Sequence, residues 1–221
     1  MIRLPILIVL LSLAASAANE AVERVKAAAV VLQEIMATSD KAIPQDLLDK
    51  AECAIVVPGM KKGAFIVGAK YGRGFMSCRK TGGGWSAPGA VRVEGGSVGF
   101  QIGGSETDVV MLVLNKRGAE KLLESKFTLG GDVAVAAGPV GRSSTAETDG
   151  TMRAEILSWS RSRGVFAGIS LKGSTMRPDE PAIKELYGKD LTNRAILTGD
   201  VAVPPDAQAF VSLLTKYSGR K

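Results

Sequence analysis

SWSRSRGVFAGISLKG, which spans Ser158–Gly173, indicates the fold of this chain together with the preceding turn GPVGR at 138–142. Arg161 and Arg163 are two residues apart, so an extended strand displays both guanidinium groups on one face. Apolar side chains then occupy alternate positions, as in a half-buried strand, at Val165, Ala167, Ile169 and Leu171. Paired guanidinium groups near a glycine-rich turn ending in Arg142 favour a phosphate or carboxylate partner. A sheet edge kept soluble by charge has the same pattern, so both interpretations stay open.

The middle of the chain consists of short strand-like runs separated by glycine-rich turns. The predicted strands are 54–57, 63–71, 74–79, 97–102, 108–114, 132–137, 152–158 and 165–171, with a short helix inserted at 116–125. The pair Lys61-Lys62 is expected at the turn between the first two runs. Many short strands of this kind predict a curved antiparallel sheet, a sandwich or a partly closed barrel.

Helical periodicity is found on both sides of this β-rich middle. The predicted helices are 19–36, 44–52, 181–187, 191–197 and 205–217. The apolar stripe of the first helix is expected to pack on its own domain, because that helix carries only two basic residues for a membrane surface. The fold class is therefore α+β, with N- and C-terminal helices bracketing the sheet.

The N-terminus has the order of a secretory signal peptide. Arg3 precedes an apolar run at 4–13, and the small residues at 14–18 include an A-x-A pattern at 15–17. The apolar run is short for a membrane span. We therefore expect residues 1–17 to be removed, residues 18–221 to form a single domain, and the protein to be exported, in a bacterium most simply to the periplasm.

Charge and composition narrow the classes of partner. The 221 residues have a formal net charge of +6, which becomes +5 when Arg3 is removed. This balance favours an anionic partner. Aromatic residues make up only 5% of the chain, and no dense Lys/Arg tract is present, so no nucleic acid is expected.

The two cysteines, Cys53 and Cys78, allow two interpretations. In an oxidising compartment a bridge between them closes a loop of about 25 residues and stabilises the fold by roughly 3 kcal/mol. Two buried thiols in apolar strands are the alternative interpretation. The sequence does not show whether the two strands are neighbours.

Motifs for catalysis are incomplete. The run 95–99 fits G-x-S-x-G, but the chain contains no histidine to activate Ser97, which leaves only a lysine as its base. The run 138–143 lacks the leading glycine and the lysine of a phosphate loop. We expect no catalytic residues, no metal site and no cofactor.

Several stretches in order resemble the SYLF domain family, lipid-binding modules of fungal actin-binding proteins and animal phosphoinositide-binding adaptors. They are Trp85–Pro88, Gly95–Gly103, Asp108–Val113, Ala137–Arg142 and Ser158–Gly173. The similarity runs from about Val22 to Tyr187. The resemblance implies binding of acidic phospholipids. The signal peptide and the lack of a dense Lys-rich N-terminal segment argue against actin binding and phosphoinositide specificity.

The leading expectation is thus an exported, non-enzymatic protein that binds anionic lipid head groups. The candidate contacts are basic residues: Lys61, Lys62, Arg73, Arg79, Lys80, Arg142, Arg161 and Arg163. Together they are expected to form one shared positive face. Two alternatives remain: an envelope structural or protein-interaction module, actin-binding-like by resemblance, and a carrier that encloses a lipid acyl chain inside the β-rich middle.

Overall fold

The computed structural model describes residues 20–37, 43–64, 67–98, 103–139, 154–162 and 165–218. The predicted signal peptide, Arg142 and Arg163 lie outside these residues. The helices are α2 (Glu20–Ala37), α3 (Gln45–Lys50), α4 (Lys116–Lys121), α6 (Glu180–Tyr187), α7 (Asn193–Thr198), the 3-10 helix η1 (Pro205–Ala207) and α8 (Gln208–Tyr217). The strands are β1 (Cys53–Ala64), β2 (Val67–Cys78), β3 (Gly89–Val98), β4 (Gly103–Val113), β5 (Phe127–Thr128), β6 (Val135–Ala137), β7 (Ile156–Ser162), β8 (Val165–Gly168) and β9 (Thr175–Pro178).

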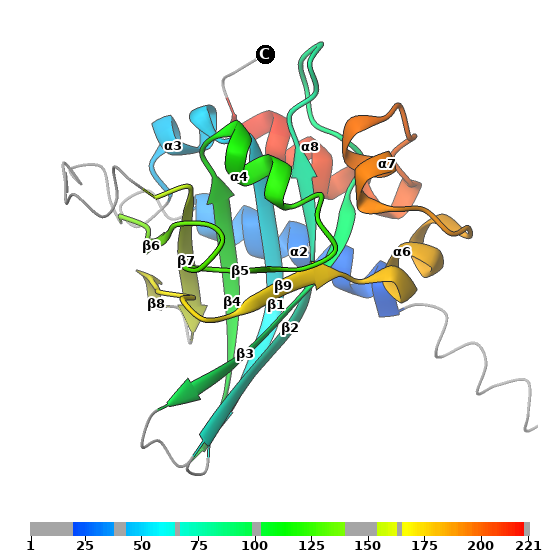
Figure 1. Ribbon diagram of the computed structural model, residues 1–221. Helices are drawn as coiled ribbons and strands as arrows, with labels where there is room; N and C mark the ends of the chain where they lie inside the picture. The colour runs from blue at the N-terminus through cyan, green and yellow to red at the C-terminus, as the bar shows by residue number, and fades with distance from the viewer. Residues whose placement is uncertain are drawn as a thin grey trace, which may run out of the picture.

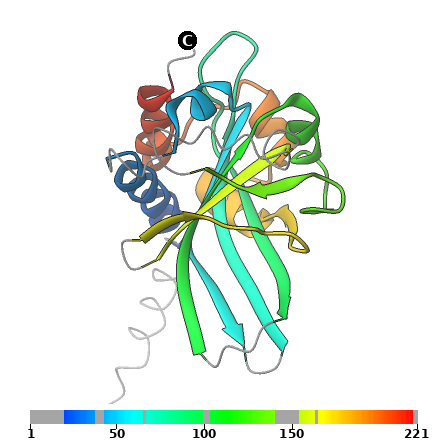
Figure 2. The same cartoon turned by 90° about the vertical axis from the view of Figure 1, so that its left-hand side faces the viewer.

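The described strands form one sheet in the order β5-β9-β3-β2-β1-β4-β7-β6, with β8 also paired to β7 (Figure 1). Neighbouring strands are antiparallel except β6 and β7, which are parallel. The sheet curls, as Figure 2 shows from the side. The predicted α+β class, with a curved sheet between N- and C-terminal helices, is confirmed, although the sheet is mixed at one edge.

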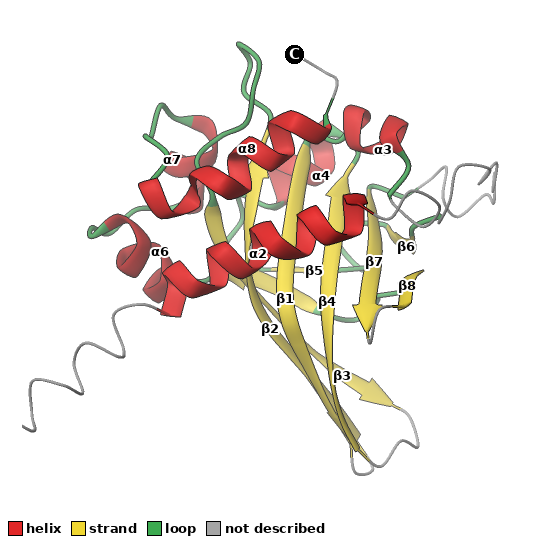
Figure 3. Cartoon of the chain, turned by 180° about the vertical axis from the view of Figure 1, so that it is seen from behind, coloured by secondary structure: helices red, strands yellow, loops and turns green. Residues whose placement is uncertain are grey.

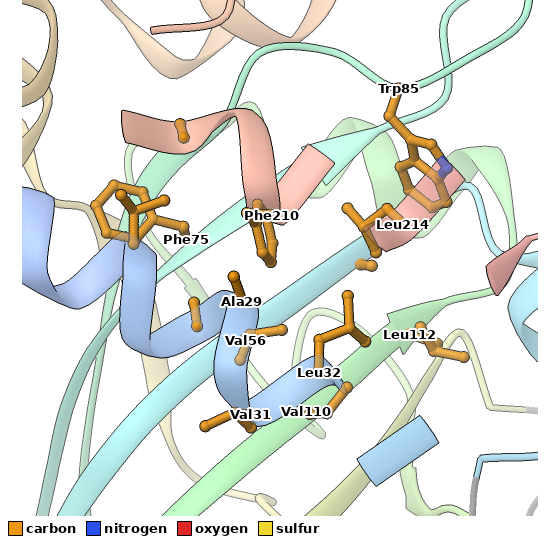
Figure 4. Close-up of a cluster of buried hydrophobic side chains, with 14 of the residues drawn as sticks. Ala29, Val31, Leu32, Val56, Phe75, Trp85, Val110, Leu112, Phe210 and Leu214 are labelled. Atoms are coloured by element: carbon orange, nitrogen blue, oxygen red, sulfur yellow. The ribbon is translucent and has the colours of Figure 1, made fainter. Parts of the chain in front are cut away.

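Helices cover one face of the sheet, which we call the helical face (Figure 3). Ala54 and Val56 of β1 point to this face and pack with buried residues of α2 and α8. Figure 4 shows this cluster, in which Leu32 of α2 and Phe210 of α8 meet the sheet. The stripe of α2 is therefore used in the core, as its periodicity predicted.

The residues that alternate with these point to the other side, which we call the opposite face. Ile55 and Val57 of β1 pack there with Met76, Leu129 and Leu171. All of these side chains are buried, so this part of the opposite face is covered by apolar packing. The carrier hypothesis stays a prediction.

The first predicted strand was too short. The run 54–57 is not followed by a turn at Lys61-Lys62, because β1 continues to Ala64 through a bulge between Val57 and Met60. Gly59 accommodates the bulge with a φ of 56°. A proline followed by a glycine, as at Pro58-Gly59, commonly ends a strand, but here the two residues form a bulge within one continuous strand. This correction places both lysines inside the sheet.

The turn Gly138-Pro139 packs against the tryptophan of the SWS stretch. A Cβ atom at Gly138 would lie 2.0 Å from Cε2 of Trp159, and the indole N–H donates to the carbonyl of Pro139 at 2.8 Å. Only glycine allows this approach. The two most informative stretches of the sequence are thus one packing unit at the edge of the sheet.

Cys53 and Cys78 form a disulfide, which settles the alternative left open by the sequence. They occupy directly opposite positions in the antiparallel pair of β1 and β2, with their Cα atoms 4.0 Å apart. Both side chains belong to the cluster on the opposite face.

We expect Cys53→Ala with Cys78→Ala to lower the free energy of unfolding by about 3 kcal/mol, because the unfolded chain regains the freedom of a loop spanning a sequence separation of 25. Urea denaturation of the double variant and of the parent, with and without reductant, measures this. The reduced parent should match the variant. Equal stability of the oxidised and reduced parent would contradict the prediction.

Candidate functional site

The structure separates the predicted contacts instead of joining them in one positive face. Arg142 and Arg163 lie outside the described residues. Arg79 and Lys80 follow the disulfide end of β2, whereas Lys61 and Lys62 lie near the other end of β1. That end of the sheet extends past the helices (Figures 1 and 3). The expectation of a shared positive face is therefore wrong for the described residues.

Arg73 is held by carboxylates in the helical layer. Its Nη2 donates to Oδ1 of Asp179 at 3.0 Å, and its Nη1 lies 3.2 Å from Oε1 of Glu20 at the start of α2. Asp179 is 2% exposed. The hydrogen bond to Asp179 is the main cause that raises the pKa of Arg73 above its ordinary value. This arginine neutralises a buried carboxylate, which makes it a structural residue.

Arg161 is paired in the same way at β7. Its Nη2 donates to Oδ2 of Asp108 at 2.7 Å, and its Nη1 also bonds Glu34 of α2. Asp108 in turn accepts from the backbone N–H of Gly59 at 3.0 Å. The guanidinium thus ties α2, β4 and the bulge of β1 together.

Arg79 and Lys80 have local partners at the disulfide end. Arg79 donates to the carbonyls of Ala51 and Leu48 and lies 4.3 Å from the ring centroid of Trp85. Nζ of Lys80 donates to Oδ1 of Asp200 at 2.8 Å. That lysine also lowers the pKa of Asp200.

Lys61 and Lys62 remain, and the sheet register adds a third lysine. Lys62 is directly opposite Lys70 of β2, and Lys61 is opposite Tyr71. Because neighbours alternate, Lys62 and Lys70 share the opposite face, whereas Lys61 and Tyr71 share the helical face. Among the described residues, none of the three lysines forms an ion pair with a carboxylate, unlike Lys80. We call Lys61, Lys62 and Lys70 the lysine end of the sheet.

Two carboxylates lie near the lysine end, and neither forms an ion pair with its lysines in the described residues. Glu106 is opposite Lys61 in β4, but its Oε1 would lie 2.4 Å from a Cβ atom at Gly59, so the carboxylate lies over the bulge. Glu94 is opposite Tyr71 and bonds Arg177 at 2.5 Å. On the opposite face the neighbours of Lys70 and Lys62 in the same row are Gly95 and Ser105, which carry no charge.

The pair of Lys62 and Lys70 lowers the stability of the folded state. Like charges directly opposite one another destabilise a sheet. Burial, and then the charge of Lys70, lower the pKa of Lys62 below its ordinary value of 10.5. Both effects disfavour the ammonium form, and an anion between the two strands would relieve both. The arrangement therefore suits an anionic ligand.

Sequence reasoning missed Lys70 because the run 63–71 was treated as a strand without a register. Arg92 and Arg177 were missed too: they continue the row of Arg73 across β3 and β9, where Glu94 pairs with both. If β1 and β2 are aligned as a pair of strands separated by two residues, Lys70 lies directly opposite Lys62. That alignment could have identified Lys70 as a candidate contact from the sequence.

Lys62→Met should raise the free energy of unfolding at neutral pH by roughly 0.5–1 kcal/mol, the scale of a like-charged cross-strand pair. A base whose pKa is lowered by folding destabilises the fold below that lowered pKa, and the cost disappears as the pH rises toward 10.5. The advantage of the variant should therefore shrink between neutral pH and pH 10.5, as urea denaturation at several pH values measures. Lys61→Met is the control, and an equal gain there would contradict the assignment.

No group of three or more metal-ligating side chains occurs in the described residues. Ser97 lies in β3, but its side chain is outside what the structure describes. Among the helices described, none is both long and apolar enough to cross a bilayer.

Comparison with known proteins identifies relatives. A family model described as "Ysc84: Las17-binding protein actin regulator" matches residues 94–217. The chain is 34% identical over 181 residues to Protein YSC84 of Saccharomyces cerevisiae, covering 80% of this chain and 38% of that protein. It is 34% identical over 199 residues to SH3 domain-containing YSC84-like protein 1 of Rattus norvegicus, covering 87% and 58%. LAS seventeen-binding protein 3 of Saccharomyces cerevisiae is 35% identical over 180 residues, covering 80% and 39%. The chain thus spans about two fifths to three fifths of these relatives.

Proposed function

The chain belongs to the Ysc84 (SYLF) family, described as Las17-binding actin regulators. From the unpaired lysines of the structure, we propose that it is a non-enzymatic module that binds anionic phospholipid head groups through its lysine end. The family description names a regulator rather than an enzyme. We further propose that the protein acts outside the cytoplasm at a membrane surface, on the strength of its N-terminal sequence.

One observation carries the proposal: Lys62 and Lys70 are half-buried, directly opposite one another, and without a carboxylate partner in the described part of the chain. Each basic side chain near an anionic membrane contributes about 1 kcal/mol, so three lysines contribute about 3 kcal/mol. That is enough for reversible binding and too little for permanent attachment.

Vesicle flotation tests the proposal with the protein lacking residues 1–17. We expect the protein to float with vesicles that contain phosphatidylserine and to stay behind with pure phosphatidylcholine. Binding should weaken when the Debye length falls from about 30 Å to about 8 Å. Equal recovery with both lipid compositions, or binding indifferent to salt, would refute an electrostatic lipid site.

A second candidate function is binding to actin or to a protein that regulates actin, which the family description favours. Relatives named for Las17 binding and for SH3 domains are longer than this chain, so their partners are only a proposal for it. Co-sedimentation with filamentous actin tests this candidate. Pelleting of the protein that is unaffected by lysine-end substitutions would support a separate protein surface.

A further inference from the structure

The lysine end has a geometry that specifies how a membrane meets the protein. Lys61 and Tyr71 point to the helical face, whereas Lys62 and Lys70 point to the opposite face. A sheet that lies flat on a bilayer presents only one of its faces. A planar surface reaches both pairs together only at the ends of the strands.

We propose that the sheet docks end-on, with the ends of β1 to β4 toward the bilayer, Tyr71 at the level of the head groups and α2 away from the lipid. This inference rests on the proposed lipid binding and adds its orientation. Figures 2 and 3 show that these strand ends extend past the helices, so the helical layer does not obstruct an end-on approach.

No charged residue of β1 or β2 lies between Lys62 or Lys70 and the adjacent strand ends. Lys62 is two residues from the end of β1, a distance of about 7 Å along a strand. Gly63 and Ala64 follow it in β1, and Val67, Gly68 and Ala69 precede Lys70 in β2. Lysine stems lie along apolar surface while the ammonium group reaches toward the interface, so both side chains extend to lipid phosphates.

An aromatic side chain accompanies the lysines. Among the described residues, three large apolar side chains are well exposed: Val30 at 51%, Tyr71 at 45% and Val165 at 64%. Tyr71 alone of these is in register with a lysine of the lysine end. Tyrosine is enriched at membrane interfaces because its ring is apolar and its hydroxyl is polar.

Helix α2 is a poor alternative surface for an anionic bilayer. Its apolar stripe packs in the core, and its charged residues are Glu20, Glu23, Arg24, Lys26 and Glu34, a net charge of −1. Val30 borders a surface hollow that is also lined by Glu106, Asp108 and Arg161. The charge of Arg161 is already offset by Asp108 and Glu34, and the exposed Glu106 adds a negative charge that would repel lipid phosphates there.

Tryptophan quenching by lipids with brominated acyl chains tests the orientation. The native tryptophans, Trp85 and Trp159, are buried and give a constant background. We compare Tyr71→Trp, Val30→Trp and Val165→Trp on phosphatidylserine-containing vesicles. The bromine-dependent loss of emission should be about twofold greater for Tyr71→Trp than for the parent, and unchanged for the other two.

Each other result is decisive. Greater quenching in Val30→Trp than in Tyr71→Trp would overturn end-on docking in favour of α2, and greater quenching in Val165→Trp would place the β8 edge on the membrane. Equal quenching of all three would show that no fixed orientation exists. Flotation of the same proteins separates the two proposals: binding with the wrong quenching pattern refutes only the orientation, whereas absence of binding refutes the lipid function and the orientation with it.

Discussion

Replacing Lys62 and Lys70 together by glutamate should weaken binding to anionic vesicles by at least about 30-fold. Losing two basic contacts of about 1 kcal/mol each removes about 2 kcal/mol, and every 1.4 kcal/mol is a factor of ten. The new carboxylates also repel the lipid phosphates, so the loss should exceed this figure. Titration of protein with vesicles in a flotation or sedimentation assay gives the ratio of dissociation constants.

A charge-matched control removes the effect of net charge. Lys126→Glu with Lys189→Glu changes two exposed lysines in the connections that follow α4 and α6. Either double variant lowers the formal charge of the protein lacking residues 1–17 by four units, from +5 to +1. The control should retain binding within a few-fold of the parent. Equal losses in the two variants would show that overall charge, and not the lysine end, determines binding.

Folding should be little changed by the lysine-end variant. Glutamates at 62 and 70 remain a like-charged pair in the same register, so they keep the repulsion that the lysines already impose. A thermal melting point close to that of the parent is therefore expected. Loss of binding at unchanged stability identifies a direct contact.

Arg73→Met should lower the free energy of unfolding by about 3–5 kcal/mol, because it leaves the carboxylate of Asp179 buried without its partner. Urea denaturation measures the loss. Lys80→Met is the matched control: its partner Asp200 has a side chain that is 95% exposed, so solvent screens that pair and its loss should change stability little. Comparable destabilisation of the two variants would contradict the structural role of Arg73.

A double variant distinguishes a structural role of Arg73, pairing with buried Asp179, from a role in lipid contact. Arg73→Met with Asp179→Leu removes both charges and should recover much of the stability lost in the single variant. Vesicle binding of this double variant should match that of the parent. A stable double variant that no longer floats would return Arg73 to the lipid site.

The family motifs, the α+β class and the helices at both ends of the sheet followed from local patterns. Period-2 and period-3.6 alternation of apolar residues is a property of neighbouring positions, so the sequence displays it directly. The turn expected at Lys61-Lys62 was wrong because β1 continues through a bulge between Val57 and Met60, and a glycine such as Gly59 occurs in turns and in bulges alike. Strands β5 and β9 were missed because they are only two and four residues long.

The candidate site was less predictable than the fold. Lys61 and Lys62 were recognised as basic residues, but their strand assignment, their division between two faces and the presence of Lys70 all depend on register. In the sequence, Arg73 and Arg161 were basic residues with no feature that separated them from the lysines as candidate contacts. Their partners, Asp179 at 106 residues and Asp108 at 53 residues along the chain, remove them from the site.

The amino-acid sequence by itself determined the family, the α+β architecture, the excess of positive charge and the lack of histidine chemistry, because each of these is written in residue identity and short-range order. The tertiary structure decided that Cys53 bonds Cys78, that Arg73 and Arg161 neutralise carboxylates, and that three lysines lie together at one end of the sheet. Those outcomes depend on which distant segments become neighbours, and long-range register is fixed only when the whole core packs.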